Sequence, residues 1–208
     1  MEQKEMKHLY WRAGFGINPK ELEFLSTKSR EDIIDMLFYE SQNTLPLKID
    51  THEFDTLTQE QFKKTDKIQR EYIEKSRNKI KELNHAWVER VLNSHSVLQE
   101  KMTLFWSNHF ACQNGMILYV QKFHNTIREH ALGSFKELVK AISREPAMIE
   151  YLDLKQNRND KPNENFAREL MELFTLGVGN YTEEDIKEAA KAFTGYNHDF
   201  EGHFVFNE

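Results

Sequence analysis

The chain has 208 residues, of which 39% are hydrophobic and 30% charged, and its 28 Lys and Arg stand against 34 Asp and Glu for a net charge of −6. A chain of this length and composition can bury one sizeable core, and its acidic balance argues against a general binder of nucleic acid or of anionic membranes. The single cysteine, Cys112, excludes an internal disulfide and a cysteine-based zinc cluster.

The N-terminal segment, residues 1–8, lacks the apolar core of a secretory signal, and nowhere do 18 apolar residues follow one another. We therefore predict no membrane span and a cytoplasmic location, with export of the full-length protein as the alternative.

Helical patterns separated by turn signals fill the first quarter of the chain. Asn18 and Pro19 are typical of the cap and first residue of a helix, and Ser29 of the cap of the next one. The expected segments are a helix over 4–13, a glycine turn over 14–16, a helix over 19–25, a helix from 29 and a loop over 41–56.

Residues 58–94 contain neither proline nor glycine, which predicts one long helix or two nearly collinear ones. Apolar residues recur at helical spacing only in the second half of this stretch, from Ile73 to Val91. We expect the second half to pack and the first half to project into solvent.

A helix beginning at Ser96 places Leu98, Met102, Phe105 and His109 in one stripe, which puts His109 on the predicted inward face. A histidine there is either a hydrogen-bonded core residue or a catalytic or ligand-binding one. The remaining expected segments are a break at 113–115, a helix over 116–131, a helix from 134 through 142, a helix over 146–152 and a polar loop over 153–162.

The densest chemistry lies between Pro162 and Gly177. Asn163 fits a helix N-cap and Gly177 the residue after a helix end, which predicts one helix of about four turns. One side of this helix is apolar, and the other carries a polar stripe. The stripe consists of Glu164, Asn165, Arg168, Glu169 and Glu172.

After this helix, Thr182 and Asp185 form a capping-box pattern for a helix ending near Gly195. Three phenylalanines around Gly202 indicate a short terminal hairpin. We predict a mainly α fold, a single multi-helix domain over residues 1–208 with a short C-terminal β-hairpin.

The motifs over residues 11–16, 100–110, 163–179 and 188–196 resemble the signature of the bacterial "domain of unknown function 1800" family, in the family's order. The resemblance implies an N-terminal portion of a longer family domain and no established activity. It also implies, by gene association alone, a sulfatase-like protein encoded nearby as a partner.

Several kinds of site lack their patterns. The polar helix has no Glu-x-x-His pair of a di-iron site, the loop over 153–162 lacks EF-hand spacing, and no nucleophile elbow or phosphate loop occurs. We predict no metal site, and the sequence identifies no cofactor.

What remains is a constellation for acid–base or hydrolytic chemistry. His109 is the candidate proton carrier, with Glu169 or Glu172 as its acidic partner. The candidate substrate contacts are Arg168 as an anion clamp, Asn163, Asn165 and Glu164. The alternatives are a buried structural network, a non-catalytic scaffold or a protein-binding module. We expect Arg168 to be buried between Glu164, Glu169 and Glu172.

Overall fold

A computed structural model describes residues 1–42 and 45–207, and the mainly α fold with a terminal hairpin is confirmed. The helices of the first half are α1 (Gln3–Ala13), α2 (Pro19–Leu25), α3 (Arg30–Glu40), α4 (His52–Asp55), α5 (Gln59–Lys63), α6 (Asp66–Asn93) and α7 (Val97–His109). The later elements are α8 (Ile117–His130), α9 (Phe135–Ile142), α10 (Pro146–Tyr151), the short 3-10 helix η1 (Leu154–Gln156), α11 (Asn165–Glu169), the π-helical η2 (Leu170–Thr175), α12 (Glu183–Phe193), β1 (Tyr196–His198) and β2 (Phe204–Phe206).

The caps predicted at Asn18, Ser29 and Thr182 are confirmed. Asn18 accepts a hydrogen bond from the Glu21 amide, and capping boxes open α3 at Ser29 and α12 at Thr182. The short helix α4 lies inside the stretch expected to be a loop, part of which, residues 43–44, falls outside the described residues.

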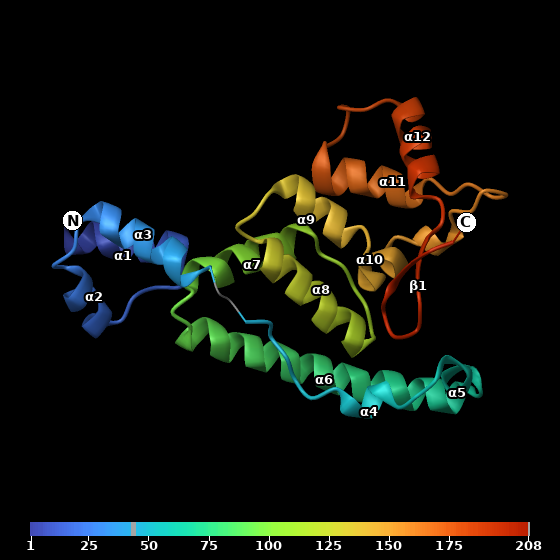
Figure 1. The fold of residues 1–208 in the computed structure, drawn as a ribbon, viewed down its shortest axis with the longest axis horizontal. Coiled ribbons are helices and arrows are strands. Elements are labelled where there is room, and N and C mark those ends of the chain that lie inside the picture. The colour runs from blue at the N-terminus through green and yellow to red at the C-terminus, as the bar shows by residue number, and fades with distance from the viewer. Residues whose placement is uncertain (43–44, 208) are drawn as a thin grey trace.

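Helices α1–α3 form a group at the N-terminal end with an apolar cluster of its own, built on Met6, Leu22 and Ile33 (Figure 1). Val97 and Leu98 of α7 pack against this cluster and join the group to the rest of the molecule. Gly14 follows α1 because a Cβ there would lie 3.0 Å from the Val97 Cβ.

The main core lies between α6, which runs along one side of the molecule, and the layer of α7, α8, α9 and α10 above it (Figure 1). Ile117, Phe123 and Ile127 of α8 are buried in it, as their spacing predicts. The antiparallel hairpin, with His198 paired to Phe204, closes the C-terminal end.

The stretch over 58–94 is two helices, because Thr65 caps α6 through a hydrogen bond from the Ile68 amide. Most residues over 58–70 are exposed, yet α5 packs on α6. Phe62 is the anchor, since its ring lies 5.2 Å from that of Tyr72 and 5.3 Å from that of Phe200.

The inward face of α7 differs from the predicted one. Phe105 is 54% exposed, whereas Gln99, Glu100 and Thr103 are buried. The prediction counted apolar residues as the buried ones, but this helix buries polar groups that have partners on neighbouring elements, and the face is rotated accordingly.

The partner of Glu100 is Arg128 of α8. The Arg128 side chain is 2% exposed and that of Glu100 is 0% exposed, and the guanidinium donates from Nε and Nη2 to the two carboxylate oxygens at 3.2 and 2.7 Å. Trp87 of α6 donates its indole N–H to Glu100 at 2.9 Å. Three helices therefore meet at one carboxylate.

The same network holds the extended segment after α3, residues 45–49. Asn125, which receives a hydrogen bond from Arg128 at 3.3 Å, also binds the backbone N–H and C=O of Leu47 at 2.7 and 2.9 Å. One turn earlier, Gln121 accepts from the Ile49 amide at 2.8 Å, and Arg90 donates to the Pro46 carbonyl. The segment is thus fixed to α6 and α8 by side chains in place of a β-ladder.

Replacing Glu100 by Ala is expected to lower the free energy of unfolding by about 3–5 kcal/mol, because it leaves the buried Arg128 without a counter-charge. Denaturant unfolding measures this, with the exposed Glu129→Ala as control. A double Glu100→Met, Arg128→Met variant should recover most of the loss. A loss of less than about 1 kcal/mol for the single variant would be the value of an exposed pair and would contradict this role.

His124 makes the fold sensitive to acid. Burial, followed by the charges of Arg128 and Arg90, lowers its pKa from 6.5 to about 3. In the unfolded chain His124 takes up a proton near pH 6.5, whereas in the folded chain it stays neutral down to about pH 3. The free energy of unfolding therefore decreases as the pH falls from about 6.5 toward 3.

We expect His124→Gln to reduce the loss of melting temperature between pH 7 and pH 5, while the exposed His85→Gln leaves it unchanged. Thermal melts at both pH values provide the comparison, and equal slopes for wild type and His124→Gln would refute this origin of the acid sensitivity.

Candidate functional site

A cavity of about 560 Å³ opens between α5, α10 and the turn of the hairpin. Its walls combine aromatic rings with a cluster of polar side chains, which is the usual make-up of a small-molecule site. The polar lining residues include Asn114, Tyr119, Glu150, Lys155 and His198.

The hairpin turn brings the histidine to this cavity. Gly202 has φ +86°, and a Cβ on it would lie 3.1 Å from the Tyr119 ring, so the turn packs directly on α8. Asp199 accepts from the His203 amide at 2.7 Å, and Tyr119 donates to the Phe200 carbonyl at 2.9 Å. These contacts fix the end of β1 against α8 and α10.

Glu150, in the last turn of α10, is the centre of the cluster. Its Oε2 accepts from the Asn114 amide at 2.9 Å, and its Oε1 lies 3.3 Å from Nε2 of His198 and 3.5 Å from the Lys155 ammonium. Burial raises the pKa of the Glu150 carboxyl, but contact with His198 and Asn114 and the charge of Lys155 outweigh it, so the pKa lies below its usual value.

The His198 side chain is 2% exposed, and both ring nitrogens face oxygen atoms. Nδ1 lies 2.6 Å from the Asp199 carbonyl, which can only accept, so Nδ1 carries a proton. Nε2 faces Glu150 at a distance suited to an ion pair, but it is not aligned for a hydrogen bond within the described residues. The ring edge of His198 therefore lies against the Glu150 carboxylate, and a histidine beside a carboxylate is a pairing that general acid–base catalysis uses.

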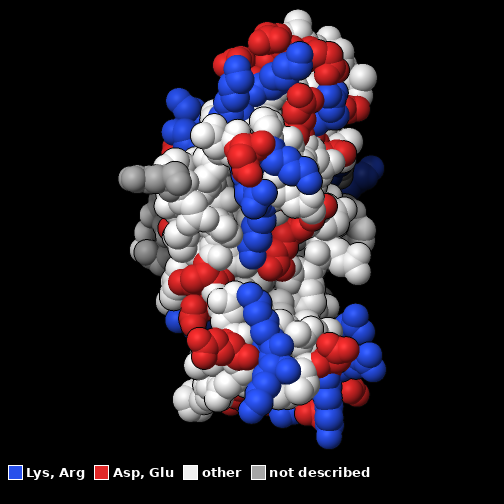
Figure 2. Space-filling view, turned by 90° about the vertical axis from the view of Figure 1, so that its right-hand side faces the viewer, with Lys and Arg blue, Asp and Glu red and all other residues white. Residues whose placement is uncertain are grey.

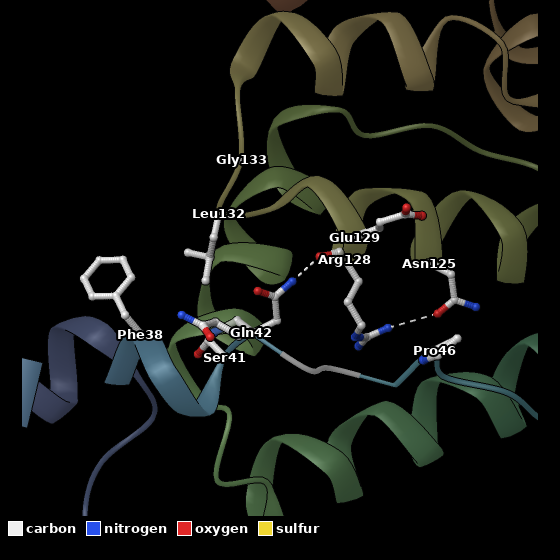
Figure 3. Close-up of a pocket in the computed structure, with 10 residues that line it drawn as sticks. Phe38, Ser41, Gln42, Pro46, Asn125, Arg128, Glu129, Leu132 and Gly133 are labelled. Carbon is white, nitrogen blue, oxygen red and sulfur yellow. Dashed lines mark hydrogen bonds between the residues drawn. The ribbon is translucent and has the colours of Figure 1, made fainter. Parts of the chain in front are cut away.

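A second cavity, of about 600 Å³, lies between the end of α3 and α8 (Figure 3). Its polar groups already serve the fold: Gln99 donates to the Arg128 carbonyl, and Arg128 donates to Asn125 and Glu100. Its Phe38 points away from these groups (Figure 3). We therefore regard this cavity as the weaker candidate.

The structure places His109 in an aromatic cluster. Its ring lies 4.6 Å from that of Phe110 and 5.6 Å from that of Trp106, and its Nε2 is 2.8 Å from the Phe174 carbonyl. Within the described residues it makes no hydrogen bond or ion pair with Glu169 or Glu172. The proposed proton carrier and its acidic partners are not in contact here.

The helix expected over 163–177 has the predicted C-terminal end, but its N-cap is Glu164 in place of Asn163 and its interior differs. It begins as α11 and continues as the π-helical η2, and Gly177 ends it with φ +79°. Asn163 accepts from the Asn165 amide at 2.9 Å, and the Asn165 side chain donates to the Leu152 carbonyl at 3.0 Å. Asn165 thus ties the start of α11 to the end of α10.

The expected burial of Arg168 is wrong, and of its expected partners Glu164 pairs with it, whereas Glu169 and Glu172 make no hydrogen bond or ion pair with it among the described residues. Arg168 is 35% exposed, and its guanidinium donates to both oxygens of Glu183 on α12 at 2.9 and 2.7 Å and to Glu164 at 3.2 Å. The spacing of residues within one helix could not predict that Arg168 pairs with Glu183 on α12.

The other acids of the stripe have different surroundings. Glu172 accepts from the Tyr181 hydroxyl at 2.7 Å. Glu169 is half-buried and forms no hydrogen bond or ion pair with any described residue. The stripe therefore connects α11 and η2 to α12 and the turn before it.

Neither Glu150 nor His198 was singled out from the sequence. The hairpin was expected around Gly202, where its turn lies, but its first strand was given no residues, so the strand that carries His198 was not recognised. The two-residue period of a strand, which puts His198 on the same face as Tyr196, was the available signal. No sequence signal joined His198 to Glu150.

Charge and size limit the other classes of site. On the face that carries α12, the hairpin and α5, basic and acidic side chains alternate, without a field of one sign (Figure 2). None of the described helices combines the length and apolar character that crossing a bilayer requires. Among the same residues, no three His, Cys, Asp or Glu side chains are grouped so that they could hold a metal ion.

Because Arg168 is partly exposed, Arg168→Ala is expected to lower the melting temperature by much less than Glu100→Ala does. Thermal melts of the two variants side by side test this. An equal or larger decrease for Arg168→Ala would mean that its link to Glu183 is a main support of the fold.

No curated protein and no solved structure is significantly similar to the chain. The sequence model of one family matches residues 8–208. The chain therefore belongs to the family described as "Protein of unknown function (DUF1800)".

Proposed function

We propose that the domain binds a small polar molecule in the cavity between α5, α10 and the hairpin, and that Glu150 and His198 perform acid–base chemistry on it. The observation that carries the proposal is the contact between Nε2 of His198 and the Glu150 carboxylate at the wall of that cavity. A histidine beside a carboxylate at the wall of a cavity matches the geometric requirement of a general acid–base pair.

Neighbouring groups support this assignment. Nδ1 of His198 is held by the Asp199 carbonyl, which orients the ring, and Asn114 holds the second oxygen of Glu150. Lys155 places a positive charge 3.5 Å from the same carboxylate, at the cavity wall. A substrate with a polar or negatively charged group would be held there beside the pair.

A screen of hydrolase and lyase substrates on the full chain tests the proposal. In any reaction found, Glu150→Gln and His198→Asn should each lower kcat/KM by about a hundredfold or more, the usual contribution of a general acid or base. His203→Asn is the matched control, since this exposed histidine lies in the same hairpin. Activity retained in both test variants would contradict the proposal.

The constellation of His109 with Glu169, Glu172 and Arg168 remains the competing location for the same chemistry. It requires rearrangement, because His109 now faces the Phe174 carbonyl. His109→Ala belongs in the same screen. If it abolishes activity with an unchanged melting temperature while His198→Asn does not, the site lies at His109.

A second candidate function, a protein-binding module, is favoured by exposed apolar residues at the end of η2. Three apolar side chains within six residues are at least half exposed: Leu173, Leu176 and Val178. The family resemblance offers a sulfatase-like protein as the partner. We propose that the two proteins meet in the cytoplasm. Co-purification with that protein, abolished by Leu173→Glu with Leu176→Glu, would favour this function, and unchanged co-purification would exclude this surface.

A further inference from the structure

A third cavity, of about 260 Å³, lies where the N-terminal group of helices meets the link between α6 and α7. Tyr10 of α1, Glu21 and Leu25 of α2, Glu40 of α3 and Val97 of α7 line it. The cavity shares none of these residues with the Glu150 and His198 site.

Tyr10 is the buried polar member of this cavity. The residue is 7% exposed, and its hydroxyl has no hydrogen-bond partner among the described residues. The hydroxyl is not fully enclosed, and Tyr10 lines the cavity together with Glu40 and Glu21, whose charges act on the phenol. The O–H is therefore free to donate to, or accept from, a molecule that enters the cavity.

Two carboxylates accompany the phenol. Glu40 is half-buried and Glu21 stands at the exposed rim, and neither side-chain carboxylate makes a hydrogen bond or ion pair with a described residue. The Glu40 backbone is fixed, because Ser96 donates its hydroxyl to the Glu40 carbonyl at 2.5 Å.

The two carboxylates repel each other, whereas the phenol is uncharged at neutral pH. Burial and then the charges of Glu40 and Glu21 raise the pKa of Tyr10 to about 12. Burial also raises the pKa of Glu40, which the nearby His95 lowers and Glu21 raises. A cation placed between these groups would relieve the repulsion.

The form of the cation follows from the lining. Among the described residues, Glu21, Glu40 and His95 do not form a group that could hold a metal ion. The floor is apolar, formed by Leu25 and Val97, and the rings of Tyr10 and Phe24 also line the space. An organic cation with a hydrocarbon body matches both parts, since ammonium groups are attracted by carboxylates and by aromatic faces.

We propose that this cavity binds a small organic ammonium ion, with its charged group between Tyr10, Glu40 and Glu21 and its hydrocarbon part against Leu25 and Val97. The volume limits the ligand to a small amine.

Chemical-shift titration of the full chain with benzylamine tests this at neutral pH, and benzyl alcohol serves as the uncharged compound of nearly the same shape. Benzylamine is expected to bind at least about fivefold more tightly than the alcohol, with shifts at the residues lining the cavity. Glu40→Gln should abolish that preference, and Tyr10→Phe should weaken benzylamine binding about two- to fivefold. Glu31→Gln, an exposed acid on the same helix, should change neither.

Melting temperatures show that each variant is folded, and Glu21→Gln, at the exposed rim, provides a second removal of charge if Glu40→Gln is unstable. Equal binding of the two compounds, no shifts at the cavity with either, or a preference that persists without the Glu40 or Glu21 carboxylate would overturn the proposal.

Discussion

The ion pair between Glu100 and Arg128 is the interaction on which the arrangement of the helices depends. It joins α7 to α8 in the interior, and through Trp87 it includes α6. A buried pair needs hydrogen bonds to all its polar atoms to be tolerated, and the chain supplies them from three helices. Because Arg128 also reaches Asn125, the position of the extended segment after α3 depends on the same pair.

The sequence predicted best those features that local chemistry determines. The caps at Asn18, Ser29 and Thr182 were readable because each depends on residues three positions apart. The face of α7 was not readable, because what buries Glu100 is a guanidinium 28 residues later in the chain. Periodicity counts apolar residues and therefore misplaces a helix whose buried face is polar.

The candidate site was missed for the same kind of reason. His109 and the polar stripe of α11 and η2 attracted attention because they are close in sequence, whereas Glu150 and His198 are brought together only by the hairpin turn. Three histidines illustrate the difference. His124 accepts from Arg128, His109 meets a backbone carbonyl in an aromatic cluster, and His198 faces a carbonyl and a carboxylate. The groups that each ring nitrogen faces, more than the helix face the residue occupies, decide which histidine can transfer a proton to a ligand.

The central claim, that His198 and Glu150 form an acid–base pair at the wall of a ligand cavity, is tested most directly by nitrogen NMR of the histidine rings. In protein with labelled histidines, the account predicts that Nδ1 of His198 carries a proton whenever the protein is folded, and that the Nε2 resonance changes in Glu150→Gln. A His198 ring whose Nδ1 is unprotonated, or whose Nε2 resonance is the same with and without the Glu150 carboxylate, would contradict it.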